Sequence, residues 1–199
     1  MFEFLIGMDK SLFWFINTTL ANPVFDKVMP FVTERNHWFL LYLYLFFFFF
    51  MKLGRNGRIA AILAILAVAL ADQTTSSLLK PLVERLRPSH ELEGVRLLVG
   101  KGGKFGFPSS HAANFFAAAI VFTIYLPRYK WLYLSIAFVV AYSRIYVGVH
   151  YPADIIAGAL IGLISAYLLS RLLFYTEKNL KKYYPLAFGK KTDKDRPMA

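Results

Sequence analysis

Hydrophobic residues form long runs along the chain, and polar residues gather at the ends of these runs. The apolar runs cover 38–51, 59–71, 112–126, 131–149 and 155–170. A helix needs roughly 20 apolar residues to cross the hydrocarbon core of a bilayer, so several runs reach that length only with the polar residues that continue them. Such polar ends are tolerated in a membrane where they face a shared interior pocket. The pattern predicts five membrane spans, at about 34–52, 59–79, 110–126, 130–149 and 153–174.

The first 33 residues have a different pattern, because charged residues interrupt the apolar ones. Glu3, Asp9 and Lys10 lie among Phe and Leu residues, and an Asn-Pro pair at 22–23 breaks the segment. This pattern favours an amphipathic helix in the membrane interface, and a sixth span is the alternative.

The predicted fold class is therefore an all-α membrane bundle of five to six transmembrane helices. We expect an amphipathic segment at 1–33, a transmembrane core at 34–175 and a basic cytoplasmic tail at 176–199. Gly158 and Gly162 form a G-x-x-x-G pattern in the last span, which predicts a close helix crossing within one chain or between chains.

Composition excludes a soluble protein. Hydrophobic residues make up 57% of the chain and charged residues 18%, against roughly 45–50% and about 25% in soluble domains. The mean hydropathy is +0.47. The chain has no cysteine, which excludes a disulfide framework, a thiolate nucleophile and a Cys-ligated metal.

The net charge of +11, from 23 basic and 12 acidic residues, reflects membrane topology or an anionic partner. Nucleic acid is not expected as a partner, because the basic residues lie between apolar runs and not along one stripe. With five spans, the basic stretches at 52–58 and 128–130 and the basic tail share one side. The positive-inside rule makes that side cytoplasmic. The N-terminal segment, the 80–110 loop and the 143–154 turn then lie on the outer side.

Three stretches on the outer side hold charged and polar residues that are costly near a membrane. They cover residues 80–88, 108–111 and 143–154. Each has an ordinary structural explanation by itself. Lys80 and Arg87 can be interfacial anchors that reach the lipid headgroups. Pro108-Ser109-Ser110 can cap a helix, and a hydrogen bond between His150 and Asp154 can hold a helix start. Arg144, inside an apolar span, is harder to explain in this way. Glu84 and Arg85 are interpreted as solvated spacers.

Taken together, the three stretches predict phosphate chemistry. Three cations and a helix N-terminus make an anion site, and guanidinium groups match phosphate oxygens. Two imidazoles, one with a carboxylate partner, supply a nucleophile and a general acid. A Zn or Mn site is the competing interpretation. It is disfavoured because two His and one carboxylate are few ligands, and the nearby cations repel a divalent ion.

In order and internal spacing, the stretches resemble the K-x6-R-P, P-S-x-H and S-R-x5-H-x3-D motifs of the type 2 phosphatidic acid phosphatase superfamily. That superfamily includes bacterial lipid phosphatases and the soluble vanadium haloperoxidases, and this chain resembles its short bacterial membrane members. The one departure is Ser110, where Gly is commonest.

The resemblance implies a role for each motif residue and no cofactor or metal. His150 would form a phosphohistidine, Asp154 would fix its tautomer, and His111 would protonate the leaving oxygen and then activate water. The phosphoryl oxygens would be held by Lys80, Arg87, Ser109, Ser110 and Arg144.

The predicted function is a lipid phosphatase of the bacterial inner membrane, with a multi-pass chain and a site that faces the periplasm or exterior. The substrate is a lipid phosphate monoester or diphosphate. Polyprenyl diphosphate, lipid A 1-phosphate, phosphatidylglycerophosphate and phosphatidate remain open, as does the oligomeric state. The alternative is a non-enzymatic anion or lipid transporter with a basic phosphate-binding pocket.

Two features have open roles. Asp72 is interpreted as a buried polar contact or as support for Lys80 or Arg144. The 89–107 loop is the candidate for substrate selection. Its expected lipid contacts are Leu97, Leu98, Val99, Phe105 and Phe107, and its expected contacts with headgroup phosphates are Arg96, Lys101 and Lys104.

Overall fold

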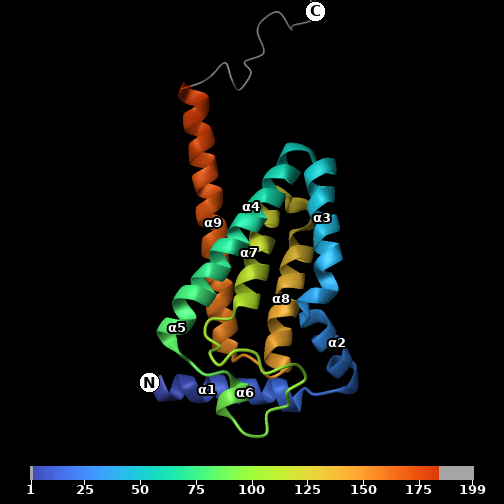
Figure 1. Cartoon of the computed structure of the whole chain (residues 1–199), viewed down its shortest axis with the longest axis vertical. Helices are drawn as coiled ribbons and strands as arrows, with labels where there is room; N and C mark the ends of the chain where they lie inside the picture. Colours follow the sequence, from blue (N-terminus) through green and yellow to red (C-terminus); the bar gives the residue numbers. More distant parts are fainter. Residues whose placement is uncertain (1, 184–199) are drawn as a thin grey trace, which may run out of the picture.

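Each of the five apolar runs forms a helix, and the helices pack side by side as a bundle (Figure 1). The computed structural model describes residues 2–183, among which there is no β-strand. The bundle consists of α3 (Phe39–Lys52), α4 (Gly54–Asp72), α7 (Ser110–Tyr125), α8 (Lys130–Tyr146) and α9 (Pro152–Tyr183). The all-α class is confirmed, and residues 184–199 of the predicted tail lie outside the described residues.

Shorter helices cover the ends and connections of the bundle. They are α1 (Phe2–Trp14), α2 (Pro23–Thr33), α5 (Lys80–Val83) and α6 (Pro88–Glu91), with the 3₁₀-helices η2 (Arg35–Trp38) and η4 (Pro127–Tyr129). Two further segments, η1 (Phe15–Thr19) and η3 (Gln73–Leu79), are π-helical.

Two continuous helical stretches, Gly54–Val83 and Pro152–Asn179, are long and apolar enough to cross a bilayer by themselves. Ser110–Tyr125 is apolar but shorter. Large apolar side chains such as Leu40 and Trp131 are mostly exposed on the outside of the bundle, where lipid and not water would solvate them. The prediction of five or six spans stays a prediction.

The N-terminal region consists of two separate short helices. α1, with 13 residues, continues directly into the five residues of η1, so 2–19 is one helical stretch of 18 residues, and α2 has 11. At about 1.5 Å per residue, both are shorter than the roughly 30 Å hydrocarbon core. α1 lies across one end of the bundle, next to α6 (Figure 1). The α3–α4 junction and the C-terminal end of α9 lie at the opposite end.

α7 is the central helix and packs against α4, α8 and α9. Its contact with α9 depends on the two glycines of the G-x-x-x-G pattern. A Cβ atom on Gly158 would lie 2.3 Å from the Ser109 carbonyl oxygen, and one on Gly162 would lie 2.2 Å from that of Ala113. The close crossing is thus within the chain, between α7 and α9.

The 89–107 loop folds back onto the bundle, which corrects the lipid contacts expected for part of it. Leu97, Leu98 and Val99 pack against a buried cluster that includes Tyr146. The Arg96 guanidinium donates to Asp26 Oδ1 of α2 at 2.5 Å. These residues fix the loop to the protein because their side chains find apolar and acidic partners there.

Gly162→Ala should lower the apparent melting temperature in detergent, because its Cβ would collide with rigid backbone of α7. Overpacking of this kind costs about 1–3 kcal/mol. Gly7→Ala is the matched control, since it lies in α1 with no atom within 4 Å of its Cβ, and Ala is the better helix former. Equal stability of Gly162→Ala and wild type would contradict the packing described.

Candidate active site

The first motif follows a π-helical segment that brings three side chains to one hydroxyl. Lys80 Nζ donates to Ser110 Oγ at 2.5 Å, and Thr75 Oγ1 donates to the same oxygen at 3.0 Å. Ser76 Oγ shares a hydrogen bond with it at 2.8 Å. π-Helical turns occur often at functional sites because they change which residues face a neighbour. The polar end of the second apolar run thus supports Lys80 and the start of α7.

The second motif opens α7. Ser109 Oγ accepts a hydrogen bond from the backbone N–H of Ala112 at 3.5 Å and caps the helix. Ser109 is fully buried, and its side chain does not line the cavity described below. Its predicted contact with phosphate stays a prediction. His111 lies in the first helical turn, where backbone N–H groups and the helix dipole favour a bound anion.

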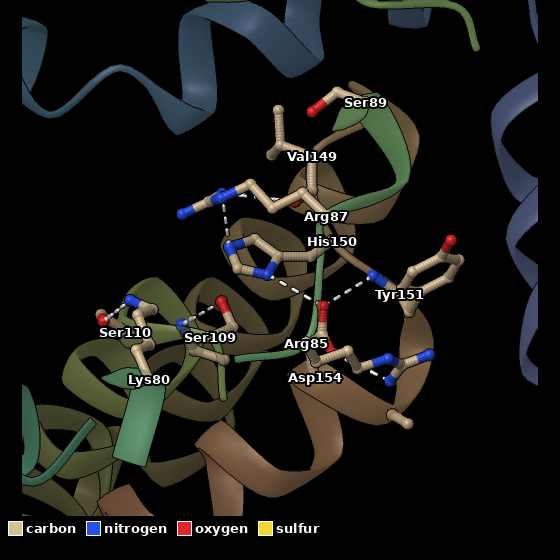
Figure 2. Close-up of polar contacts among 12 residues, drawn as sticks. Lys80, Arg85, Arg87, Ser89, Ser109, Ser110, Val149, His150, Tyr151 and Asp154 are labelled. Carbon is tan, nitrogen blue, oxygen red and sulfur yellow. Dashed lines mark hydrogen bonds and ion pairs between the residues drawn. The ribbon is translucent and has the colours of Figure 1, made fainter. Parts of the chain in front are cut away.

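The third motif forms a buried histidine–carboxylate pair (Figure 2). His150 Nδ1 donates to Asp154 Oδ2 at 3.2 Å, and Arg87 Nη1 donates to His150 Nε2 at 3.0 Å. These contacts place the proton on Nδ1 and a lone pair on Nε2. Burial lowers the pKa of His150 well below its usual value, and the cations Arg87, Arg144 and Lys80 lower it further. His150 is therefore neutral at pH 7, and the lone pair on Nε2 faces Arg87.

Arg144 reaches the same region from α8. Its Nη1 donates to Thr33 Oγ1 of α2 at 2.6 Å, and its Nε has no hydrogen-bond partner among the described residues. An unpaired guanidinium N–H in a buried position is a donor available to an anion.

One cavity of about 940 Å³ connects these groups. Six of the eight predicted site residues line it: Lys80, Arg87, Ser110, His111, Arg144 and His150. Asp154 and Ser109 do not line the cavity. Asp154 contacts His150, and Ser109 caps the start of α7. Most of the remaining wall is apolar and comes from α3, α4 and α7, including Phe49, Ala61 and Phe122. From Lys80 to Ala61 the cavity follows the helix for roughly 28 Å.

The open question about Asp72 is resolved in favour of a polar contact with a neighbouring helix. Asp72 Oδ1 accepts a hydrogen bond from Asn114 Nδ2 at 3.0 Å, and both side chains line the cavity. The other amide atom, Asn114 Oδ1, is buried without a partner among the described residues. The pair therefore offers hydrogen-bonding groups to a ligand below the cationic end of the cavity.

The interpretation of Arg85 as a solvated spacer is wrong. Its side chain is 22% exposed, and its Nη1 donates to Asp154 Oδ1 at 3.0 Å. Its Nη2 donates to Asp9 Oδ2 of α1 at 2.6 Å. Asp9 is one of the charged residues that interrupt the apolar N-terminal segment, but nothing in the sequence pairs it with an arginine 76 residues away. Glu84 is exposed, as expected of a spacer.

The family model of the PAP2 superfamily matches residues 60–178. The chain belongs to the PAP2 superfamily. The family predicted from the three motifs is thereby confirmed. The predicted enzyme class is confirmed by relatives named phosphatases, and these names favour a phosphatase over the transporter alternative. The PAP2 match begins in α4 and ends in α9, so it includes all eight predicted site residues.

Related PAP2 proteins match over most of their length. The lipid A 4'-phosphatase of Bacteroides thetaiotaomicron is 40% identical over 81% of this chain and 75% of its own. The lipid A 4'-phosphatase of Porphyromonas gingivalis is 33% identical over 87% of this chain and 76% of its own. The crystal structure of LpxE from Aquifex aeolicus superposes with a TM-score of 0.69 at 30% identity, over 81% of this chain and 93% of that one.

The buried His150 makes the stability of this PAP2 protein depend on pH. Its folded pKa is lowered, so its contribution is fully present above the unfolded value of about 6.5 and is lost as the pH falls below it. The loss is roughly 1 kcal/mol per pH unit. Between pH 7.5 and pH 5.0, the apparent melting temperature should fall further in wild type than in His150→Gln. Equal decreases in the two proteins would show that His150 accepts a proton in the folded state.

Proposed function

We propose that this PAP2 protein removes a phosphate group from a membrane lipid by transfer to Nε2 of His150. The observation that carries the proposal is the arrangement of the cavity. A neutral histidine held by a carboxylate lies with three cations at one end, and a long apolar channel extends from them. A phosphate head and a hydrocarbon tail fit these two parts in one molecule.

In the first step, His150 Nε2 attacks phosphorus and forms a P–N bond while the bond between phosphorus and the lipid oxygen breaks. Protonated His111 gives its proton to the leaving oxygen, so the lipid departs as an alcohol, or as a phosphate when the substrate is a diphosphate. Lys80, Arg87 and Arg144 offset the charge on the phosphoryl oxygens. Arg87 donates to Nε2 before substrate binds, and in the complex the guanidinium turns to a phosphoryl oxygen.

In the second step, neutral His111 takes a proton from water as that water attacks phosphorus. The P–N bond breaks, inorganic phosphate leaves, and His150 returns to its neutral form. Asp154 accepts from Nδ1 throughout and stabilises the positive charge that the ring gains when Nε2 bonds to phosphorus. No metal ion takes part in either step.

The substrate is proposed to be a phosphorylated glycolipid of the lipid A type. The 40% identical and 33% identical relatives are both named lipid A 4'-phosphatase. Asp72 and Asn114 line the cavity below the cations, where a sugar hydroxyl or amide forms hydrogen bonds. A polyprenyl diphosphate, the main alternative, brings only hydrocarbon to that level.

The orientation proposed is five crossings of the bacterial inner membrane, with the site facing the periplasm. The ends of the bundle support this orientation. The α3–α4 junction carries Lys52, Arg55 and Arg58 at the end opposite α1 and α6 (Figure 1), and basic residues mark the cytoplasmic side.

The two roles of His111 are separated by a substrate with a good leaving group. Nitrophenolate leaves without a proton, so His111→Gln should release about one nitrophenol per enzyme from p-nitrophenyl phosphate in a fast burst. Steady turnover should then be about 10²–10⁴-fold below wild type, the usual contribution of a general acid–base. Stopped-flow absorbance measures both phases. His150→Ala is the control and should show no burst, and a burst in that variant would refute the nucleophile assigned.

Substrate class is tested by phosphate release from lipid A, polyprenyl diphosphate, phosphatidylglycerophosphate and phosphatidate, each in matched detergent with EDTA. The lipid A phosphate should give the highest kcat/KM. Asp72→Leu should reduce that value while leaving polyprenyl diphosphate hydrolysis similar or faster. A preference of wild type for polyprenyl diphosphate would overturn the substrate proposed, and loss of all activity in EDTA would overturn the metal-free mechanism.

A further inference from the structure

A chain of charged contacts connects α1 to the histidine–carboxylate pair. Asp9 Oδ2 accepts from Arg85 Nη2 at 2.6 Å, and Arg85 Nη1 donates to Asp154 Oδ1 at 3.0 Å. The other oxygen, Asp154 Oδ2, accepts from His150 Nδ1. Figure 2 shows Arg85 beside Asp154, on the side away from Arg87. One arginine thus lies between two carboxylates, and one of these holds the nucleophile.

The rest of the environment fixes the Arg85 fork in place. The guanidinium carbon lies 4.3 Å from the centre of the Tyr151 ring, a cation–π geometry. Asp9 Oδ1 accepts from the backbone N–H of Ala153 at 2.8 Å, in the first turn of α9. Asp9 thereby holds both Arg85 and the helix start that carries Asp154. Its carboxylate is only 10% exposed, so leaving it unpaired would be costly.

α1 has an exposed apolar side and a side that packs on the protein, and Asp9 lies on the second. Phe4, Leu5 and Met8 are largely exposed on the outward side of the helix. Phe13 is fully buried, and its ring packs edge-on against that of Tyr151. The apolar outward side suits a membrane interface, and the inward side carries Asp9.

We propose that Asp9 and Arg85 are positioning residues for phosphoryl transfer, through which α1 holds Asp154 in the orientation that His150 requires. The inference rests on the proposed roles of His150 and Asp154. Asp154 is completely buried, and a buried carboxylate keeps its charge only with a compensating partner. Arg85 supplies that partner on Oδ1, which leaves Oδ2 free to orient the imidazole. Arg85 touches neither His150 Nε2 nor the cavity wall, so it acts through Asp154.

Arg85→Gln should lower kcat about 10–100-fold with little change in KM, because the phosphate-binding cations stay in place. Arg85→Lys should recover part of the loss, since an ammonium keeps the charge but does not bridge two carboxylates with a fixed fork. Asp9→Asn should lower kcat about 3–10-fold. In the Arg85→Gln background, Asp9→Asn should have no further effect, because the Asn side-chain oxygen still accepts from Ala153 N–H and only the contact with Arg85 is lost.

Lys10→Gln is the matched control for the docking of α1. Lys10 pairs with Glu91 of α6 from the same helix but does not touch Asp154. This variant should stay within twofold of wild type in kcat. A loss equal to that of Asp9→Asn would overturn the proposal, because general anchoring of α1 would then account for both effects.

His150→Ala distinguishes failure of this inference from failure of the proposed function. If His150→Ala is inactive and folded Arg85→Gln keeps a wild-type kcat, the positioning role is wrong and the proposed function stands. If His150→Ala itself turns over normally, the proposed function is wrong. Melting temperature and gel filtration report folding, and where Arg85→Gln does not fold, additive effects of Asp9→Asn and Arg85→Lys overturn the proposal.

Discussion

The site depends on one buried carboxylate, that of Asp154, which holds parts of all three motifs together. Its Oδ2 accepts from His150 Nδ1 and its Oδ1 from Arg85, in the first motif. Its backbone oxygen accepts from the N–H of Ser109 at 2.9 Å, at the start of α7. The backbone N–H of Tyr151 donates to Oδ2 at 3.0 Å and completes the set. A buried charge is stable only with such complete pairing, so the fold around Asp154 is specified tightly.

The low-dielectric surroundings make it costly to bury the charge of Asp154. They also strengthen the interactions of the cations at one end of the cavity. Charge–charge interactions are several times stronger in a protein interior than in water. Lys80, Arg87 and Arg144 therefore repel one another, and they add to the effect of burial in lowering the pKa of His150. A phosphate group that enters between them relieves that repulsion. The low-dielectric surroundings thus favour both a neutral His150 and the binding of phosphate that we propose.

Most of the residues that line the candidate site could be predicted from the sequence, because a charged or polar side chain next to a membrane span costs free energy unless it has a partner. Charged and polar side chains at the ends of apolar runs need a compensating structure, and Lys80, Arg87, His111, Arg144 and His150 were identified on that basis. The helical class followed from the apolar runs in the same way.

The contacts made between distant segments could not be predicted. The sequence gives no sign that Arg85 pairs with Asp9, because ion-pair partners are chosen by tertiary packing and both residues are ordinary in isolation. The 89–107 loop is a second example. Leu97, Leu98 and Val99 are apolar whether they meet lipid or protein. Contacts such as the Arg96–Asp26 pair and the hydrogen bonds between Arg96 and Asn17 fix them against the bundle. The number of membrane crossings is also hard to predict, because several helices are close to the minimum length that spans a bilayer. Composition is a weak guide to where such helices begin and end.

Close packing between α7 and α9 connects the glycine pattern with the chemistry. Gly158 lies four residues after Asp154 in α9 and faces the carbonyl oxygen of Ser109. Ser109 in turn lies two residues before His111. A larger side chain there would push α7, which carries His111, away from α9, which carries the Asp154 partner of His150. Proton transfer to the leaving group requires His111 and the phosphorus-bound oxygen within hydrogen-bond reach. The spacing of the two histidines is thus set by backbone contact between the helices.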